Sequence, residues 1–347
     1  MPEAIDQNSN SQPRGEKIYN AERGKVQLAY KEFLPSTNTD VLNPEQAIVY
    51  IPGFPNDAGD ASIGTIPQAF AENGNMRTFS VSTTPDSTKT SSSEEVEAIL
   101  KFIKEQGLTE ITLSGYSMGA ARAIELASQI KKLQGTPGEI KVDGLILFSP
   151  AGVHTEGGVA KRFLSDFPKD YKQKKENDFS GAQGTRDLLK SLAGKLKFTK
   201  GRYPAVLKRD IKELATMTPG TSDIDVPVVI FTPEKDAVSK NLAPINDPKT
   251  AREVLTTAAQ KAQMTPEELD ERAYDVYWSR RGRAQNTKDR KAYVEENIFP
   301  NSTSVDILIP EKKPTHAGLQ DFRADQATKT GLYMLNRLRR PQKQSNK

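Results

Sequence analysis

The sequence predicts an α/β fold with a mainly parallel central sheet, helices on both faces and an inserted helical cap. The first observation is an alternation of short apolar runs with helix-like segments from about residue 24 to 152. The second is the return of apolar runs at 226–231 and 305–309, after two long charged stretches. Strands that alternate with helices form a mainly parallel sheet, because each connection between parallel strands has to cross one face of the sheet.

The first half of the chain supplies most of the expected elements. Residues 26–30 alternate as a half-buried strand does, whereas 47–51 is a continuous apolar run typical of a strand buried on both faces. Ser91 and Glu94 predict a capping box at the start of a helix that ends near Gly107. The expected strands are 26–30, 47–51, 78–81, 111–114 and 145–148, and the expected helices are 63–74, 91–107 and 120–135.

One short stretch, ITLSGYSMG at 111–119, organises the rest. It is a β-branched run that ends in a G-x-S-x-G pentapeptide, and an alanine-rich segment with helical spacing follows. Gly115 and Gly119 let strand and helix pass closely, so the serine between them can be held in a strained conformation with its hydroxyl exposed. Ser117 is therefore the candidate nucleophile, and the alternative is a turn serine that serves tight packing.

Two long charged insertions separate the last strands. From 153 to 221 the strand pattern stops, and 15 Lys and Arg stand against 7 Asp and Glu between 158 and 220. We expect a helical cap here and a second helical insertion at 241–300. The basic excess is that of a solvated helical face or, alternatively, of a lid that attracts an anionic substrate or a membrane surface.

These observations divide the chain into seven segments. We expect a disordered tail at 1–15, the first part of the core at 16–152, the cap at 153–221, a core strand with an acid loop at 222–240, the second insertion at 241–300, the last strand, a histidine loop and a helix at 301–338, and a basic tail at 339–347.

The composition excludes several kinds of site. The 347 residues include no cysteine, so disulfides, thiolate metal sites and a cysteine nucleophile are excluded. Two histidines are too few for a multi-histidine metal site, and we expect no metal and no other cofactor. A net charge of +4 is too small to indicate a nucleic-acid partner without a local basic patch.

The sequence also bears on location. No apolar run is long enough to cross a bilayer, so we expect no stable membrane insertion. The first residues lack the apolar segment of a secretory signal. We therefore expect a cytoplasmic protein.

An acid and an imidazole each follow one of the later strands. Asp236 comes after the apolar run 226–231, and His316 comes after 305–309. The carboxyl ends of parallel strands share one edge of the sheet, so these side chains can meet Ser117 there. A serine hydroxyl needs a base that takes its proton, imidazole suits this role at neutral pH, and a carboxylate fixes the imidazole tautomer.

Two members of this trio have competitors. Asp236 competes with Glu234 in the same loop and with Glu156 after the preceding strand. His316 competes only with His154, the other histidine of the chain, which we interpret as a solvent-facing or pocket-rim residue.

Two backbone amides are candidates for an oxyanion hole. Attack on a carbonyl creates an oxyanion, which needs N–H donors aimed at it. The amide of Met118, at the start of the helix after the serine, is one. The amide of Phe54, in the turn after 47–51, is the other, because Gly53 allows the chain to approach closely.

Four motifs together resemble the α/β-hydrolase superfamily, in the order that this family has them. They are IVYIPGF at 48–54, GYSMG at 115–119, PVVIFTPEKD at 227–236 and THAG at 315–318. The resemblance covers about half of the chain, the sheet and its helices, and leaves out both charged insertions. Many members carry His-Gly after the third strand, whereas this chain has Pro52-Gly53.

The resemblance implies a role for each candidate residue. Ser117 would be the nucleophile, His316 the base and Asp236 the orienting acid, with the amides of Met118 and Phe54 as the oxyanion hole. The expected substrate-contacting residues beside them are Gly53 and Tyr116.

The sequence therefore predicts a serine hydrolase that cleaves an ester or thioester, or an amide, through an acyl-enzyme. Its partner would be a small ester-like molecule, an anionic one if the cap attracts it. Two alternatives remain. One is an acyltransferase with the same chemistry, and the other is a non-catalytic binding protein with a hydrolase-like fold.

Overall fold

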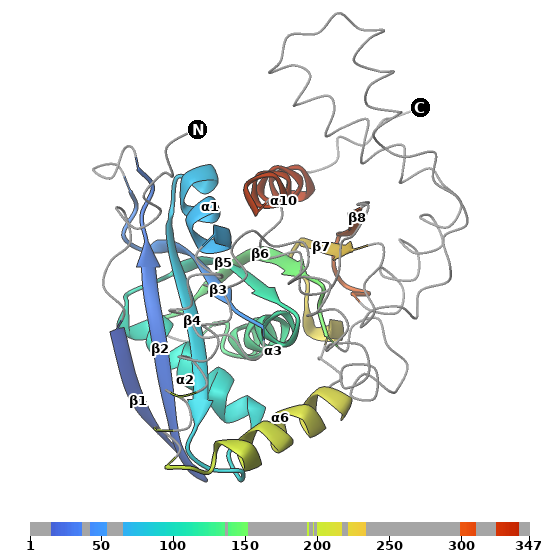
Figure 1. The fold of residues 1–347 in the computed structure, drawn as a ribbon. Helices are drawn as coiled ribbons and strands as arrows, with labels where there is room; N and C mark the ends of the chain where they lie inside the picture. The colour runs from blue at the N-terminus through green and yellow to red at the C-terminus, as the bar shows by residue number, and fades with distance from the viewer. Residues whose placement is uncertain are drawn as a thin grey trace, which may run out of the picture.

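In a computed structural model of the chain, a central sheet is covered by helices on both faces (Figure 1). The structure describes residues 15–36, 42–53, 65–135, 138–151, 200–216, 221–233, 299–309 and 324–339, together with 193 and 197.

The sheet has eight strands in the order β1-β2-β4-β3-β5-β6-β7-β8. The two N-terminal strands pair antiparallel at one edge, and β2 pairs antiparallel with β4. The remaining neighbours all pair in parallel, so the predicted mainly parallel sheet is confirmed. The strands are β1 (Gly15–Ala21), β2 (Gly24–Phe33), β3 (Gln46–Ile51), β4 (Arg77–Pro85), β5 (Glu110–Tyr116), β6 (Lys141–Phe148), β7 (Val228–Pro233) and β8 (Ser304–Ile309).

Helices cover the sheet in two layers, and each layer has its own apolar cluster. On one face, α2 (Ser92–Glu105) and α3 (Met118–Lys132) bury residues such as Ile99 and Ile124 against the sheet. On the other, α1 (Thr65–Gly74) and α10 (Ala324–Arg339) bury Phe70 and Leu335. Burial of this apolar surface is the main favourable contribution to folding.

The start of α2 has the capping box that the sequence predicts. The Ser91 hydroxyl accepts the Glu94 amide at 3.3 Å, and the Glu94 carboxylate accepts the Ser91 amide at 2.7 Å. Two backbone donors that lack intrahelical acceptors are thereby satisfied. This capping box fixes the start of α2 directly after the loop that follows β4.

One strand was not predicted. β1 begins at Gly15, inside the segment expected to be a tail, and pairs along its whole length with β2. Its sequence GEKIYNA is polar, and its Ile18 side chain is 61% exposed. An edge strand with one solvated face carries little apolar signal, so only its partner β2 was recognisable.

The 153–221 insertion contributes α6 (Tyr203–Thr216), and a short helix η2 (Thr221–Asp223) begins at its last residue. The helix α6 lies in the segment expected to form a helical cap, and the cap itself stays a prediction. The second insertion, 241–300, lies outside the described residues except for its last two.

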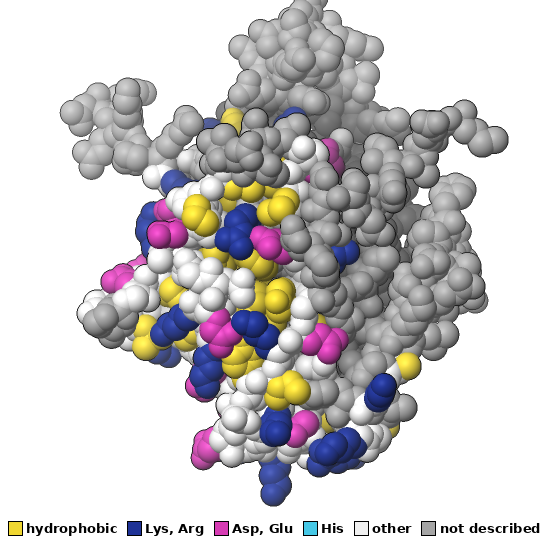
Figure 2. All heavy atoms as spheres, turned by 90° about the vertical axis from the view of Figure 1, so that its left-hand side faces the viewer, with side chains coloured by type: hydrophobic (Ala, Val, Ile, Leu, Met, Phe, Trp, Pro, Cys, Tyr) yellow, Lys and Arg dark blue, Asp and Glu magenta, His cyan; other side chains and the backbone are white. Residues whose placement is uncertain are grey.

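Charges of both signs alternate over the face that carries β1 (Figure 2). Lys17 pairs with Glu105, and Arg77 pairs with Glu32. None of the described helices combines the length and the apolar composition that a membrane span requires.

Candidate active site

The site is organised by the backbone of Ser117, which joins β5 to α3. Its φ of 53° and ψ of −119° lie in a region that residues with a Cβ rarely adopt. The Ser117 amide donates to the carbonyl oxygen of Phe148 at 2.8 Å, and its carbonyl accepts the amide of Ala151 at 3.1 Å. Both bonds tie the strained residue to the end of β6, so the neighbouring strand holds it in this conformation.

Glycines make the turn sterically possible. A Cβ on Gly119 would collide with the carbonyl oxygens of Ile51 and Pro52, and one on Gly115 would lie 2.6 Å from the amide nitrogen of Ala120. The end of β3 therefore passes directly against the first turn of α3. This is the close strand-to-helix approach that the G-x-S-x-G pattern predicts.

The turn after β3 also reaches the serine. A Cβ on Gly53 would lie 2.7 Å from Cδ1 of Tyr116 and 3.1 Å from Cβ of Ser117. Gly53 is thus adjacent to the serine, as the sequence predicts. Phe54, the next residue and the expected amide donor, lies outside the described residues.

Ser117 and Met118 stand at the amino end of α3. Ser117 is 5% exposed, and its side chain makes no capping bond to the helix. Met118 is the first helical residue, and its amide is among the N–H groups that have no acceptor within a helix. A helix amino end also carries partial positive charge, which favours a nearby anion.

Tyr116 is buried in the apolar cluster beneath α1 and α10, where it belongs to the same group as Tyr50, Phe70 and Phe148. Its ring borders Gly53. The part of Tyr116 nearest to the serine is its backbone and ring edge, and the rest of the ring supports the turn from inside the core.

The other two members of the predicted triad, Asp236 and His316, lie outside the described residues, and so do their competitors Glu234, Glu156 and His154. The strands that lead to the two predicted members are described. β7 ends at Pro233, three residues before Asp236, and β8 ends at Ile309, seven residues before His316. Because β5 to β8 are consecutive parallel neighbours, the carboxyl ends of β7 and β8 lie at the edge of the sheet where Ser117 lies.

Sequence reasoning missed a second serine at this edge. Ser149 follows β6, has a φ of 45°, and donates its amide to the carbonyl oxygen of Phe231 at 2.7 Å. Its side chain is fully buried, and its hydroxyl has no hydrogen-bond partner among the described residues. The only signal in the sequence was its position directly after a strand.

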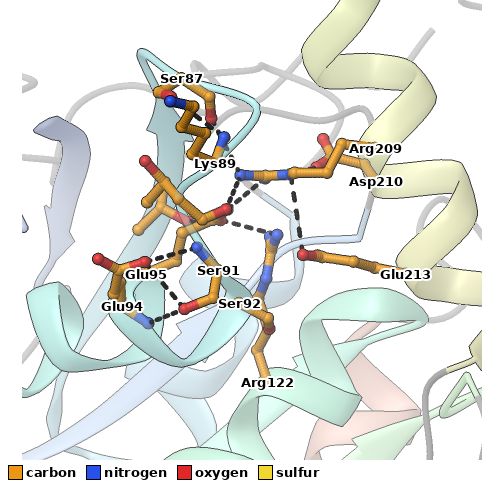
Figure 3. Close-up of polar contacts among 12 residues, drawn as sticks. Ser87, Lys89, Ser91, Ser92, Glu94, Glu95, Arg122, Arg209, Asp210 and Glu213 are labelled. Atoms are coloured by element: carbon orange, nitrogen blue, oxygen red, sulfur yellow. Dashed lines mark hydrogen bonds and ion pairs between the residues drawn. The ribbon is translucent and has the colours of Figure 1, made fainter. Parts of the chain in front are cut away.

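It also missed a buried group of charges at the same edge, which we call the ionic cluster (Figure 3). Its members come from three helices and are Glu95 of α2, Arg122 of α3, and Arg209, Asp210 and Glu213 of α6. A signal for it was present, because Glu95 adjoins the apolar face of α2 and Arg122 interrupts an alanine-rich run.

Burial shapes the electrostatics of the ionic cluster. Burial raises the pKa of Glu213 to about 6, attraction by Arg209 acts in the opposite direction, and repulsion from Glu95 adds to the rise. Burial and the negative charge of Glu95 also raise the pKa of Asp210. Both carboxyl groups are therefore easier to protonate than exposed ones.

Within the described part of the chain, no group of three or more His, Cys, Asp or Glu side chains is arranged to hold a metal ion.

No protein-family model matches the chain, and no curated protein matches it in sequence. Among solved structures, a probable hydrolytic enzyme from Pseudomonas aeruginosa PAO1 superimposes with a TM-score of 0.52, at 15% identity, over 92% of this chain and 94% of that one. A bacterial membrane phospholipase A gives 0.49 at 14% identity over 94% and 88%. A carboxyl esterase from the fungus Tuber melanosporum gives 0.46 at 13% identity over 97% and 89%. At these identities the first of these superpositions establishes a shared arrangement of strands and helices.

Proposed function

Because the chain has the α/β-hydrolase fold, we propose that it is a serine hydrolase that cleaves a carboxylic ester or thioester through an acyl-enzyme. The observation that carries the proposal is the conformation of Ser117. A non-glycine residue at a φ of 53° is costly to maintain, and here it is held by bonds to β6 and by close passage of β3. Such stored strain is found at sites where a side chain must be presented for chemistry.

The proposed reaction begins with attack of the Ser117 hydroxyl on the substrate carbonyl. His316 accepts the hydroxyl proton and then donates it to the departing alcohol or thiol, and Asp236 orients the imidazole. The new C–O bond forms as the carbonyl π bond opens, and re-closure expels the leaving group. Water then attacks the acyl-enzyme by the same route, which releases the acid and regenerates the serine.

Two backbone amides stabilise the oxyanion that forms in each step. The amide of Met118 stands at the amino end of α3, where the helix also contributes partial positive charge. That of Phe54 follows Gly53, which lies against Ser117. This chain has Pro52-Gly53 where many family members have His-Gly. Phe54 keeps its backbone N–H, because only proline itself lacks one.

The proposed substrate contacts lie beside Ser117 at the same edge of the sheet. Gly53 and the ring edge of Tyr116 border the serine and are the proposed substrate contacts. A small ester-like molecule fits this description, and the basic excess of 158–220 favours an acyl or alcohol part that carries negative charge.

A fluorophosphonate probe tests the proposal. We expect the wild-type protein to be labelled on Ser117, the S117A variant to resist labelling, and H316A to hydrolyse a p-nitrophenyl ester at least a hundredfold more slowly than wild type. Circular dichroism of both variants controls for folding. A folded wild-type protein that no concentration of probe labels would contradict the proposal and favour a binding protein, whereas product formed only with an added alcohol acceptor would favour an acyltransferase.

A further inference from the structure

The ionic cluster takes no part in the proposed acyl transfer, yet it is among the most buried charged groups of the described residues. The Glu95 side chain is fully buried, and those of Arg122, Arg209 and Asp210 are 8%, 10% and 9% exposed. Charges are placed at such depth only when they are paired, because each one loses its hydration.

Arg209 is the residue through which α6 enters the cluster (Figure 3). Its guanidinium binds the Glu95 carboxylate, donates to Asp210 at 2.5 Å and donates to the carbonyl oxygen of Thr90 at 2.5 Å. Glu213, one turn along the helix, lies 3.8 Å away. The planar fork of arginine serves several acceptors at once, which lysine cannot do.

The contact continues to the helix that begins at Ser117. The second oxygen of Glu95 binds Arg122 at 2.8 Å, and Thr83 of β4 donates to the same oxygen at 2.8 Å. Arg122 lies on α3, five residues after Ser117. A chain of contacts from Arg209 through Glu95 to Arg122 therefore connects α6 to the first turns of α3.

This connection lies at the carboxyl edge of the sheet. Thr90 and Glu95 belong to the loop and helix that follow β4, and Arg122 belongs to the helix that follows β5. In a parallel sheet both lie at the edge to which the strands point, which is the edge of Ser117. The helix α6 comes from the 153–221 insertion, so the cluster joins the insertion to the core beside the candidate nucleophile.

Carboxyl groups outnumber cations in the cluster, and Arg209 of α6 is one of its two cations. Glu95, Asp210 and Glu213 face Arg122 and Arg209, and Glu125 of α3 also faces Arg122 and Glu95. Burial raises the pKa of Glu125 as it does that of Glu213 and Asp210. Without Arg209, the fully buried Glu95 would share a single cation with the remaining carboxyl groups.

We propose that Arg209 is a positioning residue that, through Glu95 and Arg122, holds α6 of the insertion against the helix beginning at Ser117 and so fixes one wall of the substrate site. The substrate part of this inference rests on the proposed function. The structural part, that Arg209 holds α6 on the core, stands without it.

The test uses the full chain with the R209M, R209K and K208M variants. Lys208 is an exposed residue of the same helix, so K208M removes one positive charge without touching the cluster. We expect R209M to lose hydrogen-exchange protection in α6 by at least tenfold, R209K to lie between R209M and wild type, and K208M to match wild type. Unchanged protection of α6 in R209M would overturn the inference.

A kinetic comparison separates positioning from general damage. For a long-chain p-nitrophenyl ester, which extends past the serine, we expect R209M to raise KM about tenfold, while kcat and the labelling of Ser117 by a small fluorophosphonate change less than threefold. Equal losses for the long-chain ester and for p-nitrophenyl acetate would overturn the positioning role. If wild type itself is not labelled, the proposed function fails, and the exchange experiment still decides whether Arg209 holds α6.

A second variant covers the case in which R209M does not fold. In R209M/E95Q the carboxylate that R209M orphans is also removed, so the cluster keeps Arg122 and has one buried negative charge fewer than in R209M alone. We expect this double variant to recover the wild-type circular dichroism spectrum but to keep the low protection of α6. Recovery of full protection in the double variant would show that Arg209 does not position the helix.

Discussion

At the scale of the residue, the site depends on a backbone conformation more than on side-chain contacts. Ser117 occupies a φ of 53° because Phe148 and Ala151 bond to both sides of it and Gly119 removes the obstacle to β3. The G-x-S-x-G pattern predicted this turn from sequence alone. The strained Ser149 could not be predicted, because its positive φ follows from a bond to β7, which lies far away in the chain.

Substitution of Ser117 separates the loss of the reactive hydroxyl from the effect of backbone strain on stability. Both S117A and S117G should lose activity with the hydroxyl. We expect S117G to be more stable than S117A by about 1 kcal/mol, since glycine adopts positive φ without a steric cost. Urea denaturation measures the difference. At the exposed helical position Ser93, where φ is ordinary, the order should reverse, with alanine more stable by about 1 kcal/mol. The same order at both positions would contradict the assignment of strain.

A methyl group at Gly53 should disturb the serine directly. The G53A variant places a carbon 2.7 Å from the Tyr116 ring and 3.1 Å from Cβ of Ser117, so the turn has to move. We expect at least a tenfold loss of kcat/KM and a loss of stability of about 1–3 kcal/mol. The G74A variant is the control. Its added carbon has Cδ1 of Ile48 as the nearest atom, at 3.3 Å, and does not meet Ser117 or Tyr116, so activity should persist. Full activity of G53A would show that this turn does not shape the site.

At the scale of the element, the helices were predictable where local signals define them and unpredictable where distant partners do. The capping box of α2 and the apolar spacing of α3 are local, and both helices are found as expected. The docking of α6 depends on Glu95, a residue more than a hundred positions earlier. In the sequence Glu95 reads as the second acid of a helix amino end, so its role as the buried partner of an inserted helix was not predicted.

Glu213 of α6 contributes to the pH dependence of stability. Its pKa rises from 4.5 to about 6 on folding, so the folded state binds more protons than the unfolded state between these values. Stability from this group is therefore greatest at low pH and falls as pH rises through about 6, by about 1–2 kcal/mol. The E213Q variant lacks this loss. We expect it to be more stable than wild type at pH 8 and equal to it at pH 4.5.

Chemical denaturation at both pH values measures this difference between E213Q and wild type. The E97Q variant, at an exposed position of α2, provides the control, and its difference from wild type should be under 0.5 kcal/mol at either pH. An E213Q protein less stable than wild type at pH 8 would mean that attraction to Arg209 outweighs burial at this position.

At the scale of the whole molecule, an early helix and a late helix complete one face of the sheet together. The last helix, α10, packs on α1, and Asn73 of α1 donates to Asp325 of α10 at 2.9 Å across 252 residues of sequence. Leu335 covers Gly144 of β6. The leucine spacing predicted α10 as a helix, whereas its pairing with α1 depends on the strand order and so could not be predicted from local pattern.

Truncation of Leu335 tests how much this closing helix contributes. Leu335 is 1% exposed, and we expect L335A to lower the free energy of unfolding by about 2–4 kcal/mol through lost burial and a residual cavity. Leu338, on the next turn and only partly buried, gives the matched comparison, and L338A should cost less than half as much. Similar small losses in both variants would show that α10 is peripheral to the fold.

The parallel pairing of β6, β7 and β8 has a consequence for how new specificities could arise on this scaffold. Long stretches of sequence separate these strands, yet their ends are fixed side by side by the ladder between them. The entropy of closing a loop grows only slowly with its length, so the framework tolerates large changes in what is carried between those ends. Grafting foreign segments between the strands, while Arg209 and its acceptors are retained, would be a direct route to altered selectivity with the reactive serine left in place.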